Sequence, residues 1–169
     1  MDVFEAVRTM RAVRRYKPDP IPDDVVQRIL EAGRLTGSAG NRQPWHFVVV
    51  RDRETLERMS DIVITGRYVV DASLAIVVAI EKTRFSLSDA SRAIQSMLLT
   101  AWSDGVGGNW AGGPGHLDGL RALLGIPDEL DVVAVLPIGY PAVEVVADGK
   151  DRKPLGEVAS RERYGRRFG

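Results

Sequence analysis

The chain has 169 residues, of which 44% are hydrophobic and 27% charged, as in an ordinary globular protein, and we expect one domain over residues 1–169. It contains no cysteine, which excludes disulfides, thiolate metal sites and thiol nucleophiles, and its two histidines are too few for a histidine metal cluster. The apolar runs are too short to span a bilayer, and the acidic N-terminus does not resemble a signal peptide. We therefore expect a cytoplasmic protein without membrane contact.

The net charge is zero, but the charges are unevenly distributed along the chain. Residues 1–17 carry five basic and two acidic side chains (+3), and residues 150–169 carry seven basic and three acidic ones (+4), which leaves −7 for the middle. Two explanations of this charge pattern are open: both ends are solvated, or both ends converge on one bound anion. A nucleic-acid surface is less favoured, because the acidic body would repel it and no aromatic residue interleaves the N-terminal arginines.

The N-terminal residues 2–10 have the period of a short amphipathic helix, and a basic segment follows it. Arg8, Arg11 and Arg15 would share one face of a continued helix, whereas in an extended segment Arg11 and Arg15 would share one side. Either conformation brings several guanidinium groups together, and their geometry matches phosphate oxygens. A solvated basic turn is the alternative.

Further elements follow from the hydrophobic pattern. Helices are expected at residues 22–36, 52–59, 88–104 and 116–124, and buried strands at 47–50, 74–80 and 132–138. The helix at 88–104 is the longest and most apolar of these, so we expect it to be the central one. We find no internal repeat and no second domain boundary.

A polar loop at residues 38–46 leads directly into the first expected strand. The strand would fix the position of the loop, which offers backbone amides, the hydroxyl of Ser38 and the carboxamides of Asn41 and Gln43. This arrangement is typical of a ligand-binding loop. An ordinary helix-to-strand connection is the alternative.

A second unusual stretch, residues 105–115, has six glycines among eleven residues. Glycine permits positive φ and the close approach of another group, as a flat ring lying on the backbone would require. The stretch matches neither the dinucleotide-binding GxGxxG pattern nor the P-loop. A flexible linker is the alternative, and Trp110 inside the run argues against it.

Together these stretches resemble the FMN-dependent nitroreductase family, in the family's order and over nearly the whole chain. The most specific motif is Ser-x-x-Asn-x-Gln-Pro-Trp at residues 38–45. The others are Arg11-Ala12-Val13-Arg14-Arg15-Tyr16, the glycine-rich residues 105–113, Gly139-Tyr140-Pro141 and Lys153-Pro154-Leu155. The family often has Arg-Arg-Ser where this chain has Met10-Arg11-Ala12, which removes one phosphate cation and one hydroxyl unless Arg8 or Arg15 compensates.

The resemblance implies an α+β fold with a central, mainly antiparallel sheet flanked by helices, in an intertwined homodimer with FMN at the subunit interface. The basic residues at both ends would hold the phosphate and ribityl chain, the loop at 38–41 would reach the partner's flavin, and the Gly112–Gly113 backbone would face flavin N5. A polar contact to the pyrimidine edge of the flavin would come from near residues 65–68. The implied cofactor-binding residues are Arg11, Ala12, Val13, Arg14, Arg15, Ser38, Ala39, Gly40, Asn41, Gln43, Gly112, Gly113, Lys150 and Arg152.

The resemblance also implies a reaction. NADH or NADPH would reduce the flavin and leave, and a nitroaromatic, a quinone or a similar electron-poor small molecule would then be reduced in ping-pong order. We expect no catalytic general acid or base and no metal, because the flavin carries the chemistry. The rivals are a flavin destructase or dehalogenase type of enzyme, a flavin-binding or flavin-less dimer without turnover, and a phosphate or nucleic-acid binder.

Overall fold

The computed structural model describes residues 1–113, 117–143 and 150–168. In chain order the helices are α1 (Val3–Thr9), α2 (Asp23–Arg34), α3 (Arg53–Ile62), α4 (Ser86–Ser103), α5 (Asp118–Leu124) and α6 (Leu155–Val158), with 3-10 turns η1 (Ala39–Asn41) and η2 (Ile64–Asp71). The strands are β1 (Trp45–Val50), β2 (Leu74–Glu81), β3 (Gly107–Gly108) and β4 (Leu130–Gly139). The start of the helix expected from His116 lies outside the described residues.

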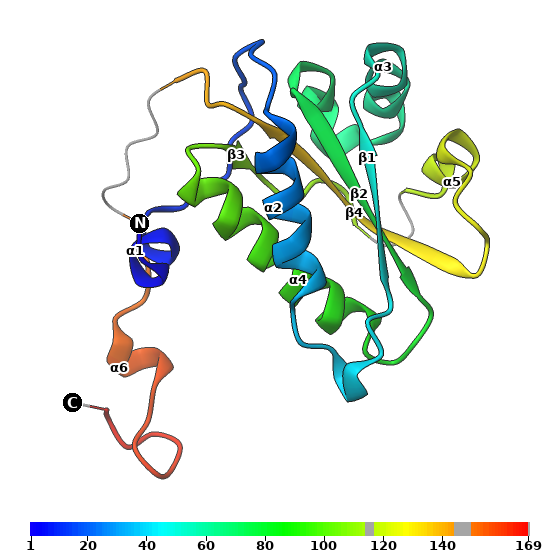
Figure 1. Ribbon diagram of the computed structural model, residues 1–169. Helices are drawn as coiled ribbons and strands as arrows, with labels where there is room; N and C mark the ends of the chain where they lie inside the picture. The colour runs from blue at the N-terminus through cyan, green and yellow to red at the C-terminus, as the bar shows by residue number, and fades with distance from the viewer. Residues whose placement is uncertain (114–116, 144–149, 169) are drawn as a thin grey trace.

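The strands form one antiparallel sheet in the order β1-β2-β4-β3. Strands β2 and β4 are central and consist almost entirely of buried apolar residues, as their unbroken hydrophobic runs predict. Helices α2 and α4 cover one face of the sheet, while α3, η2 and α5 cover the other (Figure 1). The predicted α+β class with a mainly antiparallel sheet is therefore confirmed.

Alternate residues of β2 belong to two different cores. Ile76, Val78 and Ile80 pack with α2 and α4, whereas Ala75, Val77 and Ala79 pack with α3 and α5. The capped helix expected at 52–59 is α3, in which the Asp52 carboxylate accepts the Thr55 amide at 2.8 Å. The expected helix at 88–104 is α4, whose residues Ala93, Ile94 and Met97 are fully enclosed.

Three expectations need correction or refinement. Strand β1 was expected to be buried, but it is the edge strand, and only Val50 among its residues is fully buried. The basic segment after α1 is extended rather than helical, because Ala12 and Tyr16 form single bridges to Gly108 and Pro141. The apolar face of α1 is exposed: Val3 and Phe4 keep 78% and 76% of their surface.

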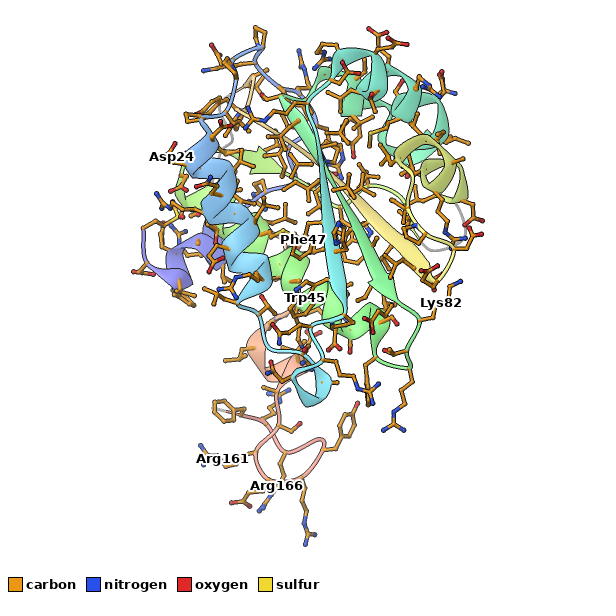
Figure 2. The ribbon with its side chains drawn as sticks, turned by 45° about the vertical axis from the view of Figure 1, so that its right-hand side comes forward. Asp24, Trp45, Phe47, Lys82, Arg161 and Arg166 are labelled. Atoms are coloured by element: carbon orange, nitrogen blue, oxygen red, sulfur yellow. The ribbon has the colours of Figure 1, made fainter. Side chains whose placement is uncertain are left out.

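The C-terminal segment lies away from the body of the chain (Figure 2, where Arg161 and Arg166 mark it). Its apolar side chains, including Leu155, Val158 and Phe168, are more than half exposed. In the described residues no helix is both long and apolar enough to cross a membrane.

Candidate functional site

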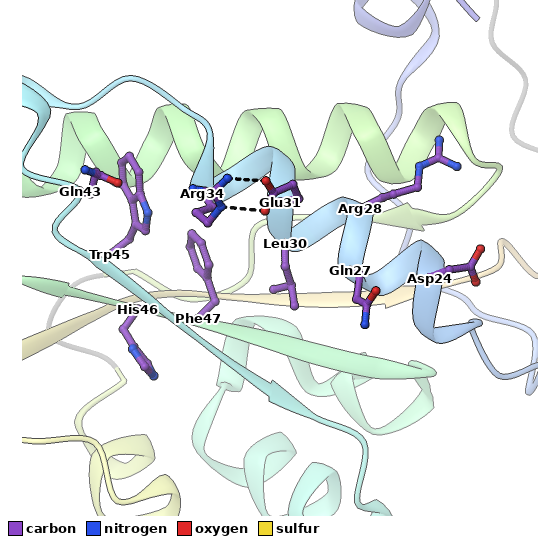
Figure 3. A pocket seen from close by; sticks show the side chains of 10 residues that line it. All are labelled: Asp24, Gln27, Arg28, Leu30, Glu31, Arg34, Gln43, Trp45, His46 and Phe47. Atoms are coloured by element: carbon purple, nitrogen blue, oxygen red, sulfur yellow. Dashed lines mark hydrogen bonds and ion pairs between the residues drawn. The ribbon is translucent and has the colours of Figure 1, made fainter.

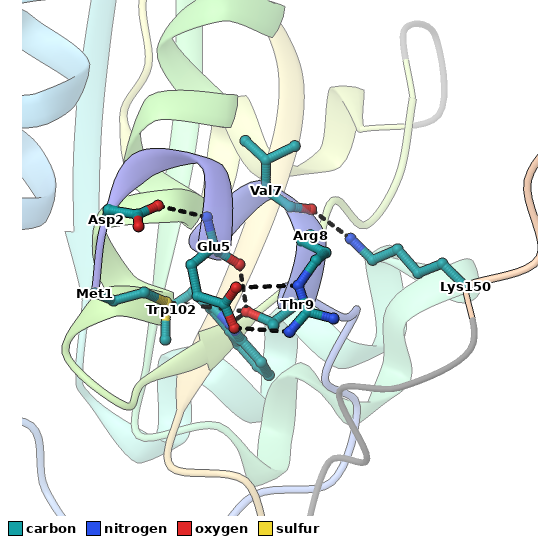
Figure 4. A network of polar contacts seen from close by, with 8 residues as sticks. All are labelled: Met1, Asp2, Glu5, Val7, Arg8, Thr9, Trp102 and Lys150. Carbon is teal, nitrogen blue, oxygen red and sulfur yellow. Dashed lines mark hydrogen bonds and ion pairs between the residues drawn. The ribbon is translucent and has the colours of Figure 1, made fainter. Parts of the chain in front are cut away.

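The N-terminal helix is held to the end of α4 by a polar network (Figure 4). The Trp102 indole donates to the Thr9 hydroxyl at 2.9 Å, and that hydroxyl donates to the Glu5 carbonyl at 2.7 Å. The Arg8 guanidinium is paired with the Glu5 carboxylate at 2.9 Å. These contacts fix the point where α1 ends and the basic segment begins.

The C-terminal basic segment reaches the same place. Lys150 donates to the Val7 carbonyl at 2.6 Å (Figure 4). Burial lowers the pKa of Lys150, and the nearby charges of Arg11, Arg152 and Arg8 lower it further. The structure thus brings Lys150 and Arg152 close to the N-terminal arginines, at a cost in charge repulsion that a bound anion would relieve.

The extended basic segment is clamped through Val13. The Val13 amide donates to the Gly108 carbonyl at 3.2 Å, and the Val13 carbonyl accepts the Tyr16 hydroxyl and the Asn109 carboxamide, both at 2.7 Å. A side chain at Gly107 would collide with Val13, since an added Cβ would lie 2.3 Å from a Val13 methyl. Both polar backbone groups of Val13 are therefore hydrogen-bonded inside the protein, and this fixes the chain that carries Arg11 and Arg14.

Asn109 connects three segments of the site. Its side chain is 4% exposed, donates to Val13 and accepts the Tyr68 hydroxyl at 2.9 Å. Burial raises the pKa of Tyr16, which shares the Val13 carbonyl, so its hydroxyl stays protonated as a donor. The glycine run, the basic segment and η2 are thereby held in one arrangement.

The glycine run ends beside η2. The Gly112 amide donates to the Thr65 hydroxyl at 3.2 Å, and the Trp110 indole donates to the Gly112 carbonyl at 3.0 Å. Gly112 has φ +77°, which favours glycine, and no atom of the described residues lies within 4 Å of the position where Gly113 would carry a Cβ. A cavity of about 460 Å³ opens here, lined by Gly112, Gly113, Leu117 and residues 62–65, where α3 ends and η2 begins.

The polar loop before β1 is tightly curled. Ser38 accepts the Gln43 amide at 2.9 Å, and Gly40, Asn41 and Gln43 have positive φ values of 60°, 53° and 51°. The Ala39 amide donates to both carboxylate oxygens of Asp89 on α4, at 3.2 and 3.3 Å. Asp89 is 2% exposed, so one buried carboxylate anchors a loop whose tip lies in solvent.

These two regions lie at opposite ends of α4. Asp89 holds the loop at its start, and Trp102 holds α1 near its end. Thirteen residues separate the two anchors, or roughly 20 Å at the rise of an α-helix. In a single chain, the loop and the basic cluster are therefore too far apart to contact the same small chemical group, such as one phosphate.

The predicted site residues divide accordingly. Arg11, Lys150 and Arg152 lie together at the basic cluster, and Ala12 and Val13 join it to the glycine run. Arg14 acts on the Tyr16 hydroxyl electrostatically, whereas Arg15 lines a separate hollow of about 710 Å³ with Lys17 and Arg53. The loop residues Ser38, Ala39, Gly40, Asn41 and Gln43 form their own region.

A broad groove of about 880 Å³ runs between α2 and the edge strand β1 (Figure 3). Trp45 and Phe47 lie nearly parallel along it, with ring centroids 6.4 Å apart. Trp45 is half-buried and Phe47 packs against the core beside α2 and α4, so the two rings form one wall of the groove. His46, on the same strand, is exposed.

Sequence reasoning missed two residues of the site, Asp89 and Asn109. Asp89 falls on the apolar stripe of α4, four residues before the buried Ala93, and a lone carboxylate there signals a polar partner. Asn109 stands inside the glycine run, where nothing in the local sequence shows that its partners lie at positions 13 and 68.

The profile of the Nitroreductase family matches residues 7–79 and 71–140. The chain belongs to the nitroreductase family. A relative in Methanothermobacter thermautotrophicus, provisionally named NADH dehydrogenase/NAD(P)H nitroreductase, is 38% identical over 150 residues, covering 84% of this chain and 78% of its own length. A relative of the same name in Archaeoglobus fulgidus is 39% identical over 152 residues, covering 85% of this chain and 87% of its own.

Solved structures of the family share the fold of this member. An FMN-dependent nitroreductase from Clostridium difficile R20291 superposes with a TM-score of 0.87 at 25% identity, over 95% of this chain and 99% of that one. The NADPH:FMN oxidoreductase of Vibrio harveyi, solved with NAD+, gives 0.83 at 25% identity, over 96% of this chain and 77% of that one. These relatives support an oxidoreductase.

Proposed function

We propose that the chain is an FMN-dependent NAD(P)H oxidoreductase that reduces nitroaromatic, quinone or similar electron-poor small molecules. The observation that carries the proposal is the convergence of Lys150, Arg152 and Arg11 beside the glycine run. Two ends of the chain that repel one another are held together there, as a phosphate site requires. The family relation supplies the class of reaction.

The residues of this region fit FMN. The basic cluster matches a phosphate group, and the Ala12–Gly108 bridge places that cluster next to the glycine run. The open face of Gly113 and the apolar cavity beside it leave room for part of a flat ring. Lys150, Arg152, Arg11 and Arg14 would hold the phosphate and ribityl chain, and Gly112 and Gly113 would lie along the ring.

A homodimer would complete the site. The loop at residues 38–43 exposes its tip roughly 20 Å along α4 from the basic cluster, so it would reach a flavin held by a second copy. The exposed apolar face of α1 and the exposed apolar residues of the C-terminal segment offer the surface that such a dimer would bury. The cytoplasmic location stays a prediction from the sequence.

FMN held at this site would supply the hydride and electron-transfer chemistry that links NADH or NADPH to the acceptor in ping-pong order. The chain contributes binding and orientation. The basic cluster anchors one end of the cofactor, and the Thr65 hydroxyl fixes the Gly112 backbone where the ring would lie. Because the Gly112 amide donates to Thr65, the Gly113 amide would be the group of this segment to stabilise negative charge near the reacting atoms.

The visible spectrum of the purified protein, recorded with and without added FMN, tests the proposal. We expect absorption bands near ~370 and ~450 nm that bleach anaerobically on addition of NADH or NADPH and return with a quinone or nitroaromatic. A colourless protein that cannot be reconstituted with FMN would instead support a flavin-less dimer. Steeply salt-dependent binding to DNA or RNA would support the nucleic-acid alternative.

A further inference from the structure

A second basic region lies at the loop end of α4, away from the Lys150 cluster. It is a groove of about 520 Å³ between the loop and the turn that follows β2, lined by Ala39, Gly40, Arg42, Lys82, Thr83, Arg84 and Phe85. Three of these seven residues are cationic and none is acidic. Figure 2 shows Lys82 at this end of the sheet, where β2 runs out.

The cations of the groove differ in how they are held. Lys82 donates to the Asp128 carbonyl at 2.7 Å and lies 3.7 Å from the Asp131 carboxylate, so part of its charge is already compensated. The Arg84 guanidinium lies 4.5 Å from the centre of the Phe85 ring, and Arg42 is exposed at the loop. The two arginines thus come from separate segments that face one groove.

The backbone beside the groove permits close approach. Gly40 has φ +60°, and within the described part of the chain no atom lies within 4 Å of the position where it would carry a Cβ. The Ala39 amide is held by Asp89, so the loop wall of the groove is fixed rather than free to close over it. A group with anionic oxygens can therefore lie against the loop and meet both guanidinium groups.

We propose that this groove binds phosphate oxygens of the nicotinamide dinucleotide donor. The inference rests on the proposed function, in which the same loop meets the flavin of the partner subunit. A donor that placed its nicotinamide on that flavin would have its pyrophosphate one ribose away, within reach of the loop. A planar guanidinium binds two phosphate oxygens at once, which explains why arginines from two segments face the groove.

The test is the anaerobic reduction of FMN-loaded protein by NADH and by NADPH, which gives an apparent dissociation constant for each donor. The variants are Arg42→Ala, Arg84→Ala and the double variant, and the control is Arg58→Ala, which removes the same charge from the exposed side of α3. Loss of one charge-assisted contact should raise the donor dissociation constant roughly 10-fold or more, and Arg58→Ala should leave it unchanged.

The pattern across donors identifies the phosphate. An equal rise for NADH and NADPH supports pyrophosphate binding, and a rise for NADPH alone supports binding of its additional ribose phosphate. Reoxidation of dithionite-reduced protein by a quinone should stay unchanged in Arg84→Ala and Arg58→Ala, which lie outside the loop. If the wild type holds FMN and is reduced by the donor, but all three groove variants keep the donor dissociation constant of the wild type, the groove inference is wrong and the proposed function stands. If the wild type binds no FMN, the proposed function itself is contradicted.

Discussion

The two ends of α4 hold their segments in different ways. At the C-terminal end, Trp102 bonds Thr9, and beyond it Val13 is bonded through its amide and twice through its carbonyl to Gly108, Tyr16 and Asn109. At the N-terminal end, the buried carboxylate of Asp89 bonds the Ala39 amide, and the tip of the loop is exposed. The basic segment is hydrogen-bonded into the interior of the protein, whereas the loop is attached only at its base, through Asp89 of α4.

This difference follows from what each region would contact. A segment that binds a cofactor within its own chain gains from rigid positioning, because less order must be imposed on binding. A loop that contacts another chain must expose its polar groups on the surface, and its base must be held by the rest of its own chain.

The largest effect on stability is expected at the buried end. Asn109→Leu would leave the Tyr68 hydroxyl without its acceptor and remove one of two donors to the Val13 carbonyl. Because unsatisfied buried polar groups are costly, we expect a loss of about 2–4 kcal/mol in the free energy of unfolding, measured by urea denaturation.

Tyr68→Phe is the matched control for Asn109. It removes the hydroxyl but keeps the ring and the bond from Asn109 to Val13, so the expected loss is about 1 kcal/mol. Equal stabilities of wild type and Asn109→Leu would show that this carboxamide does not hold the three segments together.

A smaller effect on stability, but a specific effect on the loop, is expected at the other end. Asp89→Ala removes the acceptor of the Ala39 amide and should cost about 1–3 kcal/mol, and it should weaken FMN binding by freeing the loop. Arg92→Ala is the control, because Arg92 is a partly exposed neighbour 3.8 Å from the same carboxylate. We expect it to change stability by no more than about 0.5 kcal/mol. FMN titrations that give the same affinity for Asp89→Ala and the wild type would contradict the role of the anchor.

The smallest effect concerns pH. The pKa of Lys150 is lowered in the free protein by burial and by Arg11, Arg152 and Arg8, so this ammonium loses its proton at lower pH than an ordinary lysine. An anion favours the protonated form, and FMN affinity should therefore weaken as pH rises through the lowered pKa. Lys150→Arg keeps its charge, so titrations of this variant should show a smaller decline with pH. Parallel declines in both proteins would exclude Lys150 from the phosphate site.

Much of the fold was predictable because α4 has a long helical period, whereas the apolar runs of β2 and β4 are short and rich in valine and isoleucine. Strand β1 was misjudged, since a run of valines does not reveal whether both edges of the strand are paired. The exposed apolar face of α1 has the same origin: the pattern predicts a helix but does not identify what covers it.

The candidate site was predictable only in part. The motifs located the basic segment, the loop and the glycine run, because their residue types are unusual locally. Asp89 and Asn109 were missed, because each acts on a backbone group 50 or 96 residues away, and only folding brings those groups together. The separation of the loop from the basic cluster likewise depends on which end of α4 each segment reaches.

The claim that each flavin site combines the basic cluster of one copy with the loop of another can be tested by mixing two defective chains. Arg11→Glu and Asp89→Ala, produced separately, should each bind FMN weakly. Co-expressed with different tags and purified as the mixed dimer, they should regain one site of wild-type affinity per dimer, because one site would then receive an intact cluster and an intact loop. If every site in the mixed dimer stays defective, the cluster and the loop act within the same chain, and the account is contradicted.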